Sequence, residues 1–245
     1  MNSQPITTYG LPDESKVVNQ HPWKLSREEC VLNVLKKRNL HNVADIGVND
    51  MFYTKKVKDF ADGNVYGVDI FFPEDGMMKS GINCINDVKK LAENELDCVI
   101  MMDVLEHIQD DMSFFNIVVN KLKPGGTILI TVPAYQFLFS AHDVKSQHYR
   151  RYDRKQLLKL LQRDDLKIEK IHYFYTSLFL IRLLNVILKK DNFKGNEDKW
   201  SYSQKHIITV SVKAILNIDI FINKIFDKIF IHLPGLSLLA ICKKV

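Results

Sequence analysis

Residues 97–133 read DCVIMMDVLEHIQDDMSFFNIVVNKLKPGGTILITVP, two apolar runs with one helical segment between them. Residues 97–102 and 127–132 have the length and apolar content of buried strands, and residues 112–122 carry apolar side chains at helical spacing. Residues 123–126 (KPGG) are predicted to end the helix, because proline and glycine do not continue it. A strand, a helix and a second strand in this order predict two neighbouring strands of a parallel sheet.

The same alternation continues on both sides of this stretch. We expect further strands at residues 42–47, 65–70, 81–86 and 166–175, and helices at 53–61, 88–95 and 153–162, the last capped by Asp153. A first helix is expected to begin with a capping box at residues 26–29 (SREE) and to continue to Arg38. The pattern predicts an α/β fold with helices on both faces of the sheet.

Composition sets the limits of the interpretation. The 245 residues are 46% hydrophobic, which is enough for one large domain with a core. The formal charge of +5 is mild and spread along the chain, so we predict no nucleic-acid partner. Four cysteines lack metal-binding spacing, residues 1–20 lack a secretory pattern, and no apolar run reaches the ~18 residues of a membrane span. We therefore expect a cytoplasmic protein.

Glycine is scarce. The chain has ten glycines, about 4% of its residues, where about 7% is usual. The loop after the first strand, residues 47–51, reads GVNDM and carries one glycine. A dinucleotide fingerprint needs several glycines for close approach to a pyrophosphate, whereas Asn49 and Asp50 can still form a sharp turn. The loop thus disfavours NAD and FAD and favours a ligand without phosphates.

Polar side chains are predicted at the carboxyl ends of the strands, where α/β sheets bind ligands. Asp69 closes the second strand and can accept hydrogen bonds from a ribose, or be a solvated turn residue. Asp103, Glu106 and His107 follow the fourth strand, and in a helix they would share one face. They could then act as ionisable groups for catalysis or metal binding. Alternatively, Asp103 is only a helix cap and His107 only a histidine with its hydrogen bonds satisfied. The polar loop at residues 140–152 is either the rim of an active site or a surface turn.

Four segments together resemble the class I S-adenosylmethionine-dependent methyltransferases: residues 43–47 (VADIG), 65–69 (VYGVD), 103–108 (DVLEHI) and 122–133 (LKPGGTILITVP). The tract from His142 to Tyr152, and residues 21–27, are similar to a subgroup often found beside glycan and lipid biosynthesis enzymes. The resemblance covers about residues 21–175 and 236–243. It implies a Rossmann-like sheet of seven mostly parallel strands, of which the last is antiparallel, with S-adenosylmethionine as cofactor.

The resemblance also implies roles for single residues. Asp45 and Gly47 would line the methionine moiety, with Asn49 in the same loop. The ribose and adenine would contact Asp69, Ile70, Asn86 and Asp87, and the sulfonium end would lie beside Met102 and Asp103. His107 and His142 would be candidate bases that remove a proton from an acceptor hydroxyl. Related quinone O-methyltransferases hold a divalent cation at the position of Asp103, Glu106 and His107, but we predict no metal here.

The division of the chain follows from the same comparison. Residues 1–22 are expected to be an irregular arm, residues 23–175 and 233–245 the methyltransferase domain, and residues 176–232 a helical insertion. Within the insertion, residues 178–188 and 207–231 read as helices, and nine basic residues stand against five acidic ones. The insertion is interpreted as a lid, a dimer face or a peripheral membrane contact.

The implied function is methyl transfer to oxygen on a small, lipid-linked or glycan-linked acceptor. A non-catalytic methyltransferase-like binding module is the alternative, because Asn49 and Met51 stand where the family usually has glycine. A nicotinamide oxidoreductase is a third interpretation, which the missing glycines disfavour.

Overall fold

A computed structural model of the chain describes residues 21–48, 51–188, 206–229 and 231–245. Its centre is one eight-stranded sheet with the strand order β3-β4-β2-β1-β5-β6-β8-β7. The strands are β1 (Val43–Ile46), β2 (Val65–Val68), β3 (Gly76–Met77), β4 (Ile82–Ile85), β5 (Leu96–Met102), β6 (Leu122–Pro133), β7 (Leu166–Phe174) and β8 (Ser237–Lys244).

The pairing confirms the predicted mostly parallel α/β sheet. β1 lies between β2 and β5 and is parallel to both, and β4 and β6 continue the parallel arrangement outward. β8 lies between β6 and β7 and is antiparallel to each of them, as expected for the last strand. The eighth strand is β3, a two-residue segment antiparallel to β4 that the sequence did not indicate.

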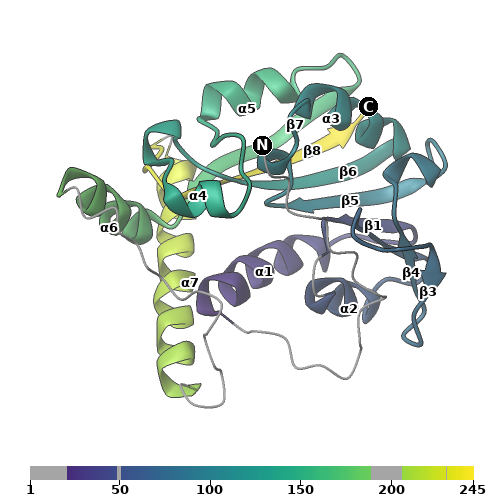
Figure 1. Cartoon of the computed structure of the whole chain (residues 1–245), viewed down its shortest axis with the longest axis horizontal. Helices are drawn as coiled ribbons and strands as arrows, with labels where there is room; N and C mark the ends of the chain where they lie inside the picture. The colour runs from purple at the N-terminus through teal and green to yellow at the C-terminus, as the bar shows by residue number, and fades with distance from the viewer. Residues whose placement is uncertain (1–20, 49–50, 189–205, 230) are drawn as a thin grey trace.

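Helices cover both faces of the sheet (Figure 1). They are α1 (Pro22–Leu35), α2 (Phe52–Lys58), α3 (Asp111–Lys121), α4 (Ala141–Lys145), α5 (Arg154–Leu161), α6 (Thr176–Ile187) and α7 (His206–Lys228), with 3-10 turns at η1 (Val88–Lys90), η2 (Leu105–His107) and η3 (Gln136–Leu138). Successive residues of β5 face opposite cores: Val99 packs with α3 and α5, and Ile100 packs with α1 and α7. The alternation explains why β5 is apolar from Cys98 to Met102.

The predicted start of the first helix is wrong. The helix begins at Pro22, because proline suits a first helical turn, and it ends at Leu35 rather than Arg38. Ser26 is therefore inside the helix and fully buried, and its hydroxyl donates to Asn217 Oδ1 of α7 at 2.7 Å. The expected helix at 88–95 is only the single 3-10 turn η1. The cap by Asp153 on α5 is confirmed.

The expected insertion supplies α6 and α7 between β7 and β8. Asp219 of α7 stands between the apolar residues Ile218 and Ile220 and is buried. Its carboxylate accepts hydrogen bonds from the backbone N–H groups of Thr176 and Ser177 at 3.1 and 2.8 Å. It thereby joins α7 to the start of α6. Among the described residues, no helix has the length and apolar character needed to cross a membrane. The expected arm lies mostly outside the described residues.

Candidate functional site

The carboxyl ends of β1, β2, β4 and β5 lie at one edge of the sheet. Ile46 of β1 is level with Val68 of β2 and with Met101 of β5, and Val68 is level with Ile85 of β4. Gly47, Asp69, Asn86 and Asp103 follow these strands, so the structure places them along the same edge. The chain order reverses between β1 and β5, which is where open α/β sheets bind ligands.

The loop after β1 turns on residues in left-handed conformations. Gly47 has a φ of +75°, and its N–H donates to Val68 O at 2.8 Å. A Cβ atom at this position would lie 2.7 Å from Val104 Cγ2, so the loop passes close to the segment after β5. Met51 has a φ of +61° and is fully buried, and its side chain covers Gly67 of β2. Methionine thus adopts the backbone conformation that glycine favours. Asn49 lies outside the described residues.

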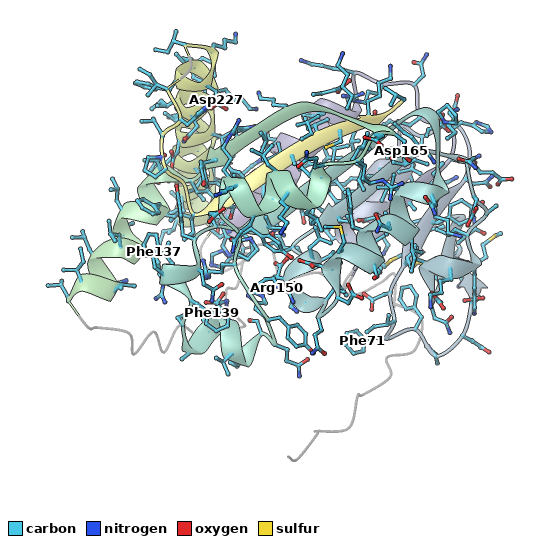
Figure 2. All side chains as sticks on the ribbon, turned by 90° about the horizontal axis from the view of Figure 1, so that it is seen from above. Phe71, Phe137, Phe139, Arg150, Asp165 and Asp227 are labelled. Carbon is cyan, nitrogen blue, oxygen red and sulfur yellow. The ribbon has the colours of Figure 1, made fainter. Side chains whose placement is uncertain are left out.

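The residues after β2 and β4 are held by local hydrogen bonds. Asp69 Oδ1 accepts from the N–H of Phe71 at 3.0 Å, which fixes its carboxylate at the end of β2, and Ile70 is 72% exposed. Asn86 Oδ1 accepts from Lys90 Nζ at 2.7 Å. Asp87 caps η1 through the N–H of Lys89 at 2.9 Å. Figure 2 shows Phe71 and Arg150 on the same side of the molecule, opposite Asp227 of α7.

Asp45 lies inside the domain, and Met102 at the end of β5 is partly buried. Asp45 is 3% exposed and accepts a hydrogen bond from Thr54 Oγ1 of α2 at 2.6 Å. This bond fastens α2 to β1 behind the Gly47 loop. The observed role of Asp45 is therefore structural support of the loop, and the contact of Asp45 with a methionine moiety stays a prediction.

Asp103 connects β5 to the first helix. It adopts a left-handed conformation with a φ of +55°, and its carboxylate accepts from Thr131 Oγ1 at 3.0 Å and pairs with the Arg27 guanidinium of α1. The same guanidinium lies 4.7 Å from the centroid of the Trp23 ring. The expectation that Asp103 shares one helical face with Glu106 and His107 is wrong, because only Leu105–His107 is helical and Asp103 is held by α1 and β6.

His148, rather than Asp103, completes the ionisable cluster with Glu106 and His107 after β5. One potential ligand atom from each of Glu106, His107 and His148 lies within 4.8 Å of the others. The two imidazole rings meet edge to face with centroids 4.6 Å apart. Glu106 is fully buried, and burial raises the pKa of its carboxyl to about 8. Burial, and then the neighbouring His148, lower the pKa of His107 below its usual value.

Asp143 of α4 orients His148. Its Oδ1 lies 2.9 Å from His148 Nδ1 and 2.8 Å from Arg151 Nε, and its Oδ2 accepts from Ser140 at the start of α4. Although burial raises the pKa of Asp143, the hydrogen bonds from His148, Arg151 and Ser140 outweigh it and lower the pKa. The carboxylate is therefore ionised and fixes the ring of His148.

The sequence placed His148 and Asp143 in a polar loop but singled out His142, which is partly buried on α4. The five-residue separation of Asp143 and His148 indicates nothing until the turn after α4 is known. That turn is fixed by the Tyr149 N–H, which donates to Glu106 O at 2.7 Å, and by the Tyr152 hydroxyl, which contacts Leu105 O at 3.2 Å.

A family model described as a methyltransferase domain matches residues 28–171. The match covers more than half of the chain, which therefore belongs to this family. The resemblance to class I S-adenosylmethionine-dependent methyltransferases is confirmed, and S-adenosylmethionine is the cofactor of this class.

Solved structures show the same fold at low identity. Phosphoethanolamine N-methyltransferase 2 from Haemonchus contortus, solved with S-adenosylmethionine, is 18% identical with a TM-score of 0.53, covering 91% of this chain and 52% of that one. This chain therefore spans about half the length of that enzyme. The N-methyltransferase NodS from Bradyrhizobium japonicum WM9, solved with S-adenosylhomocysteine, is 13% identical with a TM-score of 0.53, covering 96% of this chain and 93% of NodS.

The [4+2]-cyclase SpnF is 14% identical with a TM-score of 0.54, covering 97% of this chain and 87% of SpnF. Because two N-methyltransferases and a cyclase share this fold, the fold alone does not define the reaction. No match is found among curated proteins.

Proposed function

We propose that this chain transfers the methyl group of S-adenosylmethionine to an oxygen atom of a small, lipid-linked or glycan-linked acceptor in the cytoplasm. The observation that carries the proposal is the position of Gly47, Asp69 and Asp103 at the edge where the strand order reverses, within a matched methyltransferase domain. The ribose would be held by Asp69, and the adenine by Ile70, Asn86 and Asp87.

For methyl transfer, the protein has to position the acceptor oxygen against the methyl group and to remove a proton from the acceptor. The cofactor supplies an activated methyl group as a sulfonium, so in-line positioning of the acceptor oxygen provides most of the rate. A hydroxyl acceptor must lose its proton as the methyl group arrives. His107, whose pKa is lowered, is a neutral imidazole near pH 7 and can accept that proton, and His142 is the second candidate.

Cofactor binding is tested by calorimetry of the full chain with S-adenosylmethionine, S-adenosylhomocysteine and NAD. We expect both sulfur ligands to bind and NAD not to bind. Asp69→Ala should abolish binding, while Asp62→Ala, an exposed aspartate outside the site, should leave it unchanged. Absence of binding by all three ligands would instead support the non-catalytic module, and binding of NAD alone an oxidoreductase.

The acceptor class is tested with S-adenosylmethionine labelled in the methyl group and cell extracts separated into lipid, glycan and small-molecule fractions. We expect label to enter one fraction only when the active chain is present. Label recovered on nitrogen rather than oxygen would contradict the O-methylation proposal. A loss of activity in His142→Ala but not in His107→Ala would assign the base to His142, and the reverse to His107.

The outer face of α7 supports a membrane-surface contact. Eight apolar residues of this helix are exposed at a spacing that places them on one side: Ile207, Ile208, Val210, Ile215, Ile218, Phe221, Ile222 and Ile225. The opposite side packs on the domain through Leu216 and Ile220. Neighbouring α6 exposes four more apolar residues: Leu180, Ile181, Leu184 and Ile187. An apolar face of this size on a basic insertion suits the interface of an anionic bilayer and a lipid-linked acceptor.

Flotation with vesicles of anionic lipid tests the contact. The unaltered chain should rise with the vesicles, and the double variant Ile218→Glu, Phe221→Glu should remain at the bottom. Met77→Glu, which changes an exposed apolar residue on β3, should float normally. A chain that stays at the bottom and elutes as a dimer, with the double variant monomeric, would show that the face binds a second copy instead.

A further inference from the structure

Beyond the methyl transfer, we propose that Glu106, His107 and His148 form a binding site for a divalent cation of the Zn²⁺ class. The three side chains come from two segments, η2 and the loop after α4, and bring one carboxylate and two imidazoles within 4.8 Å of one another. Two imidazoles and one carboxylate form a donor set that Zn²⁺ and Co²⁺ prefer, and three protein ligands leave a position for an exchangeable fourth.

Glu106 provides the independent observation. It is fully buried, and neither of its carboxylate oxygens has a hydrogen-bond partner on another residue that the structure describes. A buried carboxylate without donors is costly, so native structures seldom keep one unless it has a ligand or a function. The two imidazoles of the cluster each bring a nitrogen within 4.8 Å of this carboxylate, so a cation between the three groups would give it a partner.

His148 has the supporting hydrogen bond that a histidine bound to a metal usually has. His148 Nδ1 is held at 2.9 Å by Asp143 Oδ1, which leaves its Nε2 for the cation. The backbone of Ser146 and Gln147 lies beside the His107 ring and acts to raise its pKa, against the larger effect of burial. A ring N–H bound to a carboxylate or a carbonyl fixes the tautomer and strengthens the opposite nitrogen as a ligand.

The surrounding charges favour a cation. Two guanidinium groups lie near Glu106, but each is paired with an aspartate: Arg27 with Asp103, and Arg151 with Asp143. Glu106 would give up its proton when the cation binds, and its carboxylate would then supply the net negative charge of the cluster. His107 is exposed while Glu106 is buried, so the site is closed on the protein side and open toward solvent. When the cation is bound, His107 is a ligand, and His142 remains as the base.

The backbone holds the two segments in place without the cation. The Tyr149 N–H donates to Glu106 O at 2.7 Å, and Arg150 Nη2 donates to Gln109 O at 2.6 Å. The site is thus largely preformed, and binding does not require the loop to fold.

The test is calorimetric titration of Zn²⁺ into the untagged, metal-free full chain, with visible absorption of the Co²⁺ form as a second readout. We expect one ion per chain, and an intense Co²⁺ spectrum typical of four-coordinate geometry. Glu106→Gln, His107→Ala and His148→Ala should each weaken binding at least ten-fold. Asp143→Asn, which removes the charge that orients His148 and pairs with Arg151, should weaken it about 10- to 100-fold.

The matched control is His41→Ala, which removes an exposed histidine paired with Asp62 elsewhere on the surface. It should leave both readouts unchanged. The proposal is overturned when the chain shows no saturable one-to-one binding, or when binding survives in Glu106→Gln and His107→Ala. The His107 variant alters an exposed side chain and is expected to fold even where His148→Ala does not. Because neither readout involves methyl transfer, the result is independent of the proposed activity.

Discussion

Gly47 and Met51 show how a single residue shapes the loop after β1, which the proposed cofactor would contact. Both have positive φ, but Gly47 has Val104 close to its missing side chain, whereas Met51 uses its side chain to fill the space over Gly67. The loop therefore keeps a glycine where space is absent. It tolerates a larger residue where a cavity exists, at the cost of a left-handed backbone conformation.

Gly47→Ala is expected to weaken binding of S-adenosylhomocysteine at least ten-fold and to lower the free energy of unfolding by about 2 kcal/mol, because the new Cβ adds a clash with Val104 to backbone strain. The control is Gly81→Ala, since Gly81 has the same φ of +75° but only Lys58 Cε at 3.6 Å. It should lose about 1 kcal/mol and keep its affinity. Calorimetry and chemical unfolding measure the two effects. Equal affinities in both variants would exclude a binding role for the Gly47 loop.

His172 of β7 gives a pH dependence at the scale of one side chain. Burial, and then Lys170, Lys224 and Arg154, lower its pKa to about 3, and neither ring nitrogen has a hydrogen-bond partner among the described residues. The unfolded chain, with a histidine pKa of about 6.5, binds the proton more readily. Stability is therefore complete above pH 6.5 and falls as the pH drops from 6.5 toward 3.

Between pH 6.5 and pH 5, protonation of His172 in the unfolded chain lowers the free energy of unfolding by about 2 kcal/mol, at about 1.4 kcal/mol per pH unit. His172→Leu, of similar volume, removes the proton site, so its free energy of unfolding should fall less over that interval. Urea unfolding at pH 7 and pH 5 measures the difference between the two chains. Parallel losses in both would show that His172 is not the group that titrates.

At the scale of elements, α7 is apolar on two sides for two different reasons. Leu216 and Ile220 pack against α1 and the sheet, and Ser26 of α1 bonds to Asn217, so the inner side belongs to the core. The apolar residues on the outer side are exposed to solvent. A helix with both sides apolar has the composition of a buried helix, although half of it is exposed.

Truncating each side of α7 separates the two roles. Leu216→Ala should lower the free energy of unfolding by about 2–5 kcal/mol, because it leaves a cavity in the core. Ile218→Ala, two residues away and 58% exposed, should change it by less than about 0.5 kcal/mol. Urea unfolding in the absence of lipid measures both. A large loss from Ile218→Ala would mean that the outer side is already covered in solution, for example by a second copy.

Most elements could be predicted from the sequence because their signals are local. The apolar runs of β5 and β6 and the cap at Asp153 each depend on neighbouring residues. Residues 123–126, expected to precede the strand at 127–132, belong to β6 in the structure. The start of α1 could not be predicted, because Ser26 offers a capping box that its burial against Asn217 overrides. The short β3 could not be predicted either, since two residues carry no period.

The candidate site was predictable only in part, for a related reason. Asp69 and Asp103 end strands, so their place at the edge follows from the order of the strands. The partners of Asp103 and the approach of His148 to Glu106 depend on contacts between residues far apart in the chain: Arg27 lies 76 positions from Asp103. One sequence contains no signal for such pairs.

At the scale of the whole molecule, the proposed cofactor would contact the loops after β1, β2, β4 and β5. These strands lie on both sides of the point where the strand order reverses, so the cofactor would connect the two halves of the sheet. A ligand that binds only the folded chain stabilises it by about 2.7 kcal/mol at 100 times its dissociation constant. For a chain of this size, that energy corresponds to a rise in melting temperature of about 5–11 °C. S-adenosylhomocysteine should therefore shift the melting curve of the entire domain in one step, measured by calorimetric scanning. Asp69→Ala should melt near the unliganded temperature with or without the ligand, and NAD should leave the unaltered chain unshifted. A shift confined to one of two resolved transitions would mean that the ligand binds a part of the molecule that unfolds separately from the sheet.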